Sequence, residues 1–221
     1  MNWFFSGENP FFRFTGRVLD VIVLSLLWFV CCLPVVTILP ATSALYYSCV
    51  KCIRYREPGP YGSFFSSFRE NLRTGAGAMV VFLIVAAVLW LVYHGVQMGF
   101  PGTDTKAVVI RYAYLVLMLL PVGWFSCAAA LLSRFSYSAM GLLGNSVRVA
   151  MGNLLRILPA AIVSAAVVLL SLQYFYLLVW LLLPALGALL ASLFLEPVLR
   201  KYTPLDEWED VEPEKRPWYL R

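Results

Sequence analysis

The stretch at residues 18–54, VLDVIVLSLLWFVCCLPVVTILPATSALYYSCVKCIR, decides the fold of this chain. Its thirty residues from 21 to 50 carry no charge, and Pro34 and Pro40 interrupt them. A helix that crosses a bilayer needs about 20 apolar residues, so the run is too long for one ordinary span and short for two. The sequence predicts a helix up to the first proline, a break, and a shorter helix at about 41–54.

The composition is that of a membrane protein. Of the 221 residues, 61% are hydrophobic and 13% are charged, whereas soluble domains are about 45–50% apolar and about 25% charged. One core of this size cannot bury so large an apolar excess, so lipid must solvate much of it. The net charge of +5 is therefore expected to orient the spans and to meet anionic lipid headgroups. We expect the lipid bilayer as a partner and no nucleic acid.

The remaining apolar stretches predict further spans at about 75–99, 108–132, 157–176 and 177–199. The predicted fold is an all-α polytopic membrane helix bundle with five clear spans, or six when the proline-broken first unit counts as two. We expect one integral membrane domain over residues 1–221. It comprises an interfacial N-terminal segment at 1–17, the helix bundle at 18–199 and a polar cytoplasmic tail at 200–221.

Two features of the later spans predict local geometry. Pro121 and Gly123 are expected to kink the span at 108–132. Only the four residues 173–176 separate the last two spans. We therefore expect these two spans to form a tight antiparallel hairpin.

The basic residues predict an orientation. If the first unit leaves the cytoplasm and returns, 15 of the 17 Lys and Arg residues face inward and only Lys106 and Arg111 lie outside. If the unit crosses once, the inward count falls to 13. Cytoplasmic loops are enriched in Lys and Arg, so the first arrangement is favoured and the C-terminus is cytoplasmic. The returning limb, of about fourteen residues, would then need tilt, local thinning of the bilayer or a re-entrant course.

A short amphipathic helix is expected between the first unit and the next span. Ser63 starts it, and three phenylalanines within five residues lie on one side. Such an aromatic face is typical of a helix that lies at the membrane interface. The candidate residues for a partner interface are Phe64, Phe65, Phe68 and Asn71.

The five cysteines, Cys31, Cys32, Cys49, Cys52 and Cys127, all lie in apolar segments. Cys49 and Cys52 form a C-x-x-C pair, and a folded-back first unit could bring them opposite Cys31 and Cys32 as four thiolate ligands. A buried free cysteine more often behaves as a small hydrophobic side chain. We therefore expect no metal site and no cofactor.

The sequence contains no motif for catalysis or nucleotide hydrolysis. His94 is the only histidine, and H-E-x-x-H, G-x-S-x-G and P-loop patterns are absent. The charged residues near helix ends are expected to pair locally, Asp20 with Arg17 and Glu196 with Arg200. We therefore predict that the protein is not an enzyme.

Several blocks resemble the YesL family of bacterial integral membrane proteins. They are NPFFRFTGRVLDVIVLSLLWFVCCLPVVTILPATSALYYSCVKCIRYRE at 9–57 and FFSSFRENLRTGA at 64–76. The shared features are an L-P-hydrophobic-hydrophobic-T end to the first helix, then A-x-x-A-L-Y-Y, then F-F-x-x-F-x-x-N. The later NSVRVAMGNLLR and ALLASLFLEPVLRKY are similar to the second half of the family.

This resemblance implies a multi-pass protein of the bacterial plasma membrane. The family is poorly characterised, and its genes tend to lie beside those for carbohydrate-uptake transporters and polysaccharide-degrading enzymes. Two positions depart from the family pattern. Leu39 and Pro40 stand where the family usually has Gly and Ala, and Ser25 stands where it tends to have Asn.

The polar residues of the first unit gather around its break. Prolines free backbone carbonyls, and an unpaired carbonyl in hydrocarbon costs several kcal/mol. The break could therefore form a binding centre, contacted by Pro121 and by Pro159 or Pro184. Alternatively, its hydroxyls satisfy the broken helix and nothing binds. The candidate binding residues are Pro34, Thr37, Pro40, Thr42, Tyr46 and Tyr47.

The sequence and the resemblance together predict a non-enzymatic integral membrane accessory protein associated with carbohydrate uptake. The candidate partners are a carbohydrate ABC transporter and a second copy of the chain. The alternative is a small transporter or channel in its own right, with a hydrated path at the break.

Overall fold

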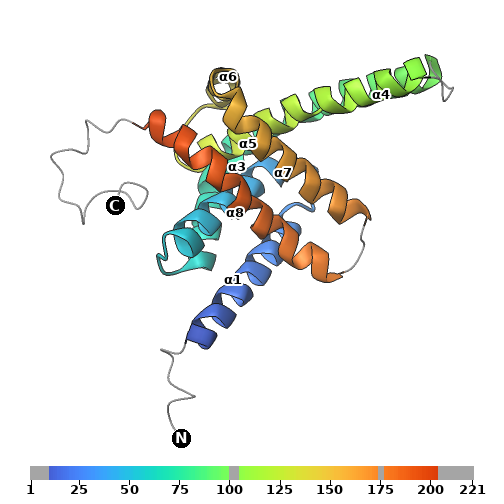
Figure 1. Ribbon diagram of the computed structural model, residues 1–221. Coiled ribbons are helices and arrows are strands. Elements are labelled where there is room, and N and C mark those ends of the chain that lie inside the picture. The colour runs from blue at the N-terminus through green and yellow to red at the C-terminus, as the bar shows by residue number, and fades with distance from the viewer. Residues whose placement is uncertain (1–9, 100–104, 174–176, 204–221) are drawn as a thin grey trace, which may run out of the picture.

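The computed structural model describes residues 10–99, 105–173 and 177–203, which are mostly helical and contain no strand (Figure 1). The α-helices are α1 (Pro10–Cys31), α2 (Ile38–Ser48), α3 (Pro60–Gly99), α4 (Thr105–Leu117), α5 (Leu119–Leu132), α6 (Ala139–Gly152), α7 (Leu154–Gln173) and α8 (Leu177–Lys201). A 3-10 turn, η2 (Val35–Thr37), precedes α2, and a π-helical turn, η3 (Cys49–Arg54), follows it.

Five helical stretches among these residues are long and apolar enough to cross a membrane. They are Val35–Arg54, Pro60–Gly99, Thr105–Leu132, Leu154–Ser171 and Leu181–Lys201. The predicted all-α polytopic membrane bundle is therefore confirmed. The segment expected at 1–17 lies partly outside the described residues, and its residues 10–17 form the first turns of α1 rather than a separate element.

The two prolines of the first unit act differently. Pro34 lies in the break after α1, where the Thr37 hydroxyl is 2.5 Å from the Cys31 carbonyl and 2.6 Å from the Pro34 carbonyl. Pro40 lies in the first turn of α2, where its missing N–H costs no helical hydrogen bond. The second limb thus begins before residue 41, and Val35–Arg54 spans 20 residues. The expected fourteen-residue limb was too short.

The first unit folds back on itself. The Tyr61 hydroxyl, at the start of α3, donates a hydrogen bond of 2.8 Å to Oδ1 of Asp20 on α1. Since 41 residues separate these positions, the chain has gone out and returned between them. The structure gives Asp20 this partner rather than Arg17, so the expected local pair was wrong. A side chain distant in sequence reaches the carboxylate instead.

Helix α3 differs from the prediction of a short interfacial helix followed by a separate span, since it is one continuous helix of 40 residues. Gly75 and Gly77 do not break it, because neighbouring helices pack against both positions. Gly75 instead permits close contact with α2. A Cβ at Gly75 would lie 2.9 Å from both Cβ and Cδ of Pro40, so these two residues fit together only while position 75 has no side chain.

The third long stretch is interrupted close to the position where the kink is predicted. Helix α4 ends at Leu117 and α5 begins at Leu119. Pro121 has no N–H to donate to the carbonyl four residues earlier, at Leu117, so the helical ladder is interrupted there. The predicted hairpin of the last two spans is also present as α7 and α8, which pack along each other; residues 174–176 lie outside the described part.

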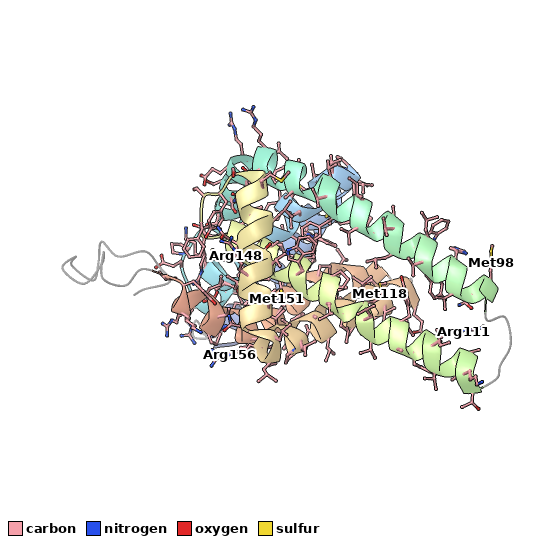
Figure 2. The ribbon with its side chains drawn as sticks, turned by 90° about the horizontal axis from the view of Figure 1, so that it is seen from above. Met98, Arg111, Met118, Arg148, Met151 and Arg156 are labelled. Atoms are coloured by element: carbon pink, nitrogen blue, oxygen red, sulfur yellow. The ribbon has the colours of Figure 1, made fainter. Side chains whose placement is uncertain are left out.

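The core of the bundle surrounds α5. All six residues from Cys127 to Leu132 are buried, against α2, α3, α6, α7 and α8. From this centre the α3–α4 pair and the α7–α8 pair extend in diverging directions (Figure 1). Helix α6 lies across the end of α5 and carries Arg148 and Met151 on its outer side (Figure 2).

Candidate functional site

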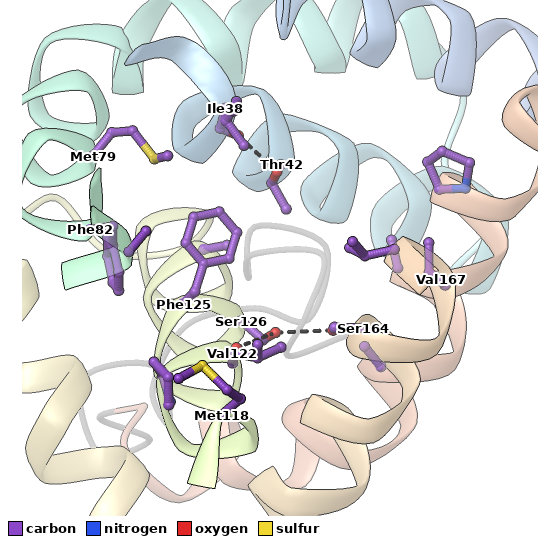
Figure 3. A pocket seen from close by; sticks show the side chains of 18 of the residues that line it. Ile38, Thr42, Met79, Phe82, Met118, Val122, Phe125, Ser126, Ser164 and Val167 are labelled. Carbon is purple, nitrogen blue, oxygen red and sulfur yellow. Dashed lines mark hydrogen bonds between the residues drawn. The ribbon is translucent and has the colours of Figure 1, made fainter. Parts of the chain in front are cut away.

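A cavity of about 670 Å³ lies between α2, α3, α5, α7 and α8 (Figure 3). Its wall is almost entirely apolar. The lining includes Ile38 and Leu45 from α2, Met79 and Phe82 from α3, Met118 and Phe125 around α5, Val167 from α7, and Ala188 and Leu195 from α8.

The cavity is long. On α3 the lining residues are Met79, Phe82, Val85, Ala86, Leu89, Trp90 and Tyr93. They recur every three or four residues and form one stripe on the helix. The fourteen steps of 1.5 Å from Met79 to Tyr93 give this stripe a length of about 21 Å, which is about two thirds of the hydrocarbon thickness of a bilayer.

The few polar groups of the wall are bonded within the protein. The Trp28 indole N–H donates to Thr42 Oγ1 over 3.2 Å, and the Thr42 hydroxyl is 2.7 Å from the Ile38 carbonyl. Ser126 and Ser164, on α5 and α7, face each other with 3.0 Å between their hydroxyl oxygens (Figure 3). These bonds leave the wall suited to apolar atoms, because its hydroxyls already have partners.

A buried charged network lies beside one end of the cavity. Arg134, in the turn after α5, donates through Nη2 to Oε2 of Glu196 on α8, and their side chains are only 1% and 3% exposed. The hydroxyl of Tyr46, a lining residue, donates to Oε1 of the same carboxylate over 3.0 Å. The expected local pair of Glu196 with Arg200 was therefore wrong, because the carboxylate points into the bundle.

A second cavity, of about 290 Å³, lies between α3 and α4. Its lining holds a cation and an amide, Arg111 and Gln97, together with Tyr93, which also lines the large cavity. The Gln97 amide donates to the Tyr93 hydroxyl over 2.7 Å. A cation inside an apolar helix is the one feature of the sequence that points to this cavity.

The candidate binding residues separate into two groups. Thr42 and Tyr46 line the large cavity, and so do the kink residue Pro121 and Pro184 on α8; Pro159 does not. Pro34, Thr37, Pro40 and Tyr47 do not line it.

These four residues have other surroundings. Pro34 is exposed. The Thr37 hydroxyl hydrogen-bonds to backbone carbonyls of the break, as expected if the hydroxyls of this region satisfy the broken helix. Pro40 is buried against Gly75. The Tyr47 hydroxyl lies 3.4 Å from Nζ of Lys51. Whether Thr42 and Tyr46 bind a ligand stays a prediction.

The candidate interface residues also differ among themselves. Phe64 is fully buried and stacks on Phe68, with ring centroids 6.3 Å apart. Phe65 is 51% exposed, and the Asn71 amide lies 3.4 Å from the Ser67 hydroxyl. Phe64 is thus a core residue, because the helix directs its side chain toward α1 and α2. Phe65 is exposed and accessible to a partner protein.

The cysteines are all free in the structure, and Cys49 and Cys127 are buried. Within the described ranges, no three His, Cys, Asp or Glu side chains are arranged to hold a metal ion.

Comparison with known proteins gives one match. No curated protein and no solved structure matches the chain. Residues 21–93, which cover the second half of α1, all of α2 and most of α3, match the family model described as "Protein of unknown function, DUF624".

Proposed function

We propose that this protein is a non-enzymatic accessory protein of the bacterial plasma membrane, with its C-terminus in the cytoplasm. It acts in carbohydrate uptake by contacting the membrane subunits of a carbohydrate ABC transporter. The resemblance to the YesL family motivates this role, and the match over residues 21–93 supports the resemblance, because YesL-like proteins are placed in that domain family.

The exposed face at the start of α3 supports contact with a partner protein. Phe65 and Leu72 are 51% and 37% exposed, and Arg69 and Arg73 are exposed beside them. These four residues lie on one side of the helix, since Arg69, Leu72 and Arg73 follow Phe65 by four, seven and eight positions. Phe64, on the opposite side, fixes the helix in the core. An aromatic residue flanked by arginines on a rigid helix has the composition of a protein interface.

The chemistry of the large cavity favours partner contact over sugar conduction by this chain. A sugar has many hydroxyl groups, each of which needs a hydrogen-bonding partner when it leaves water. The lining offers few polar groups, and Thr42, Ser126 and Ser164 are already bonded within the protein. A path through this cavity would therefore leave most sugar hydroxyls unsatisfied.

Co-purification from native membranes in mild detergent tests the proposal. The wild-type protein should enrich the membrane subunits of a carbohydrate importer relative to an unrelated membrane protein. Phe65→Ala should reduce that enrichment. Leu91→Ala is the matched control, because Leu91 is a similarly exposed apolar residue at the other end of α3, and it should behave as wild type. Recovery of the wild-type protein alone, or cross-linked only to a second copy of itself, would contradict the proposal.

The alternative, a small transporter or channel, rests on the size of the large cavity. It predicts that water reaches Thr42. In a background without native thiols, Thr42→Cys should then react with a water-soluble maleimide added to one side of the membrane. Thr37→Cys is a poorer probe, because Thr37 does not line the cavity. Protection of position 42 from both sides would argue against a pore.

A further inference from the structure

We propose that the two cavities together bind one anionic phospholipid of the membrane. An alkyl chain occupies the large cavity, and the phosphate lies beside Arg111 in the small one. This proposal is independent of the role in carbohydrate uptake.

The two cavities are adjacent and differ in chemistry. Tyr93 belongs to the lining of both. The wall of the large cavity is apolar, whereas the lining of the small one adds Gln97 and Arg111 to Val108, Tyr112 and Leu115. An apolar compartment joined to one that contains a cation matches a molecule with a hydrocarbon chain and an anionic headgroup.

The shape of the large cavity suits an alkyl chain better than a helix of a partner. Dividing 670 Å³ by the length of about 21 Å gives a mean cross-section of about 30 Å². A helix with side chains is about 10 Å wide or more and needs more than twice that area. The hydroxyls of the apolar wall are already bonded within the protein, so a polar occupant would find few hydrogen-bond partners there.

The large cavity is open to a lipid-facing surface. Ala86 is exposed, and Trp90 and Val168 are 61% and 56% exposed although all three line the cavity. Trp90 lies on α3 and Val168 on α7, both within stretches apolar enough to span a membrane. A lipid chain can therefore enter sideways between α3 and α7 without passing through water.

The position of Arg111 suits a headgroup. Figure 2 places it at the end of the α3–α4 pair that carries Met98. Trp90, Tyr93 and Tyr114 gather nearby, with 5.7 Å between the two tyrosine rings, and such aromatic residues favour the level of the lipid headgroups. A guanidinium there meets a phosphate with charge-assisted hydrogen bonds.

Native mass spectrometry of the purified protein with added phosphatidylglycerol or phosphatidylcholine tests the proposal. The wild type should retain one phosphatidylglycerol and bind phosphatidylcholine more weakly. Arg111→Gln should weaken phosphatidylglycerol binding by about tenfold or more, given the strength of a charge-assisted hydrogen bond, and should change phosphatidylcholine binding little. Lys106→Gln removes an exposed cation from the same helix and should have no effect.

Blocking the mouth of the large cavity provides a separate test. Ala86→Trp should weaken binding of both lipids, because the indole occupies the opening. Ala87→Trp is the matched control, since Ala87 is exposed but does not line the cavity. Both substitutions are at exposed positions, so folding should be retained. Equal effects of Arg111→Gln and Lys106→Gln, or of Ala86→Trp and Ala87→Trp, would overturn the proposal. If Arg111→Gln does not fold, Arg111→Lys should keep the preference for phosphatidylglycerol, and loss of that preference counts against the proposal.

Discussion

The hydroxyl of Tyr46 donates a hydrogen bond of 3.0 Å to the Glu196 carboxylate, although 150 residues separate the two in sequence. Arg134 binds the other oxygen of the same carboxylate. This network joins α2, the end of α5 and α8 at a single buried point. Because Tyr46 also lines the large cavity, the same residue connects the cavity wall to the contact that holds three helices together.

Removing the cation of this network should destabilise the protein severely. Arg134→Ala leaves the Glu196 carboxylate buried without its cationic partner, a change that costs about 3–5 kcal/mol in comparable sites. Tyr46→Phe should cost less, about 1–2 kcal/mol, because it removes one hydrogen bond. Thermal unfolding in detergent measures both effects.

Two controls make this prediction specific. Arg200→Ala should leave the unfolding temperature unchanged, because Arg200 is exposed and Glu196 pairs with Arg134 instead. The double variant Arg134→Met with Glu196→Leu should be more stable than Arg134→Ala, since it removes both charges. Equal losses for Arg134→Ala and Arg200→Ala would show that the buried pair is not what holds the helices.

Adding a methyl group at Gly75 should destabilise the contact between α2 and α3. The new Cβ would meet Pro40 at 2.9 Å and Leu132 Cδ2 at 3.1 Å, which forces the helices apart. Gly95→Ala is the matched control on the same helix, because nothing lies within 4 Å of its Cβ position. It should stabilise by about 0.5–1 kcal/mol, as alanine does in an open helical site. In thermal unfolding, Gly75→Ala should lower the unfolding temperature and Gly95→Ala should raise it.

The neighbouring residues Phe64 and Phe65 should respond differently to truncation. Phe64→Ala empties a fully buried site and should cost about 3–5 kcal/mol of stability. Phe65→Ala should change stability little, because half of that side chain is exposed. Thermal unfolding measures the stability of both variants. A large loss of stability for Phe65→Ala would mean that reduced co-purification of this variant reflects misfolding rather than a lost contact.

The sequence predicted the features of the fold that depend on local chemistry. Apolar length identified the spans, and proline identified the interruptions at Pro34 and near Pro121, because a missing N–H acts on the same helix. The continuity of α3 was not predictable from its glycines, since packing against Pro40 decides whether the helix persists at Gly75.

The candidate site was predicted only in part, because it too depends on packing between distant segments. Thr42 and Tyr46 could be singled out because they are polar residues in an apolar unit. The partner of Glu196 could not be predicted, because Arg134 is 62 residues away in sequence. Only the crossing of α5 and α8 brings the two residues together. The large cavity likewise arises from the divergence of helices, which no single segment encodes.

The first unit folds back, so that α1 and the start of α3 lie together. Cysteine cross-linking in native membranes tests it most directly, with Asp20→Cys and Tyr61→Cys in a chain without its five native thiols. The hydrogen bond between these positions joins the ends of their side chains. Because a tyrosine side chain is long, a bis-maleimide with a spacer of about 10 Å, rather than a direct disulfide, should bridge the two cysteines, with no such product for a Tyr61→Cys variant alone. If residues 18–54 crossed the bilayer once, the two positions would lie about 30 Å apart. Labelling of positions 20 and 61 from opposite sides of the membrane, without cross-linking, would contradict the account.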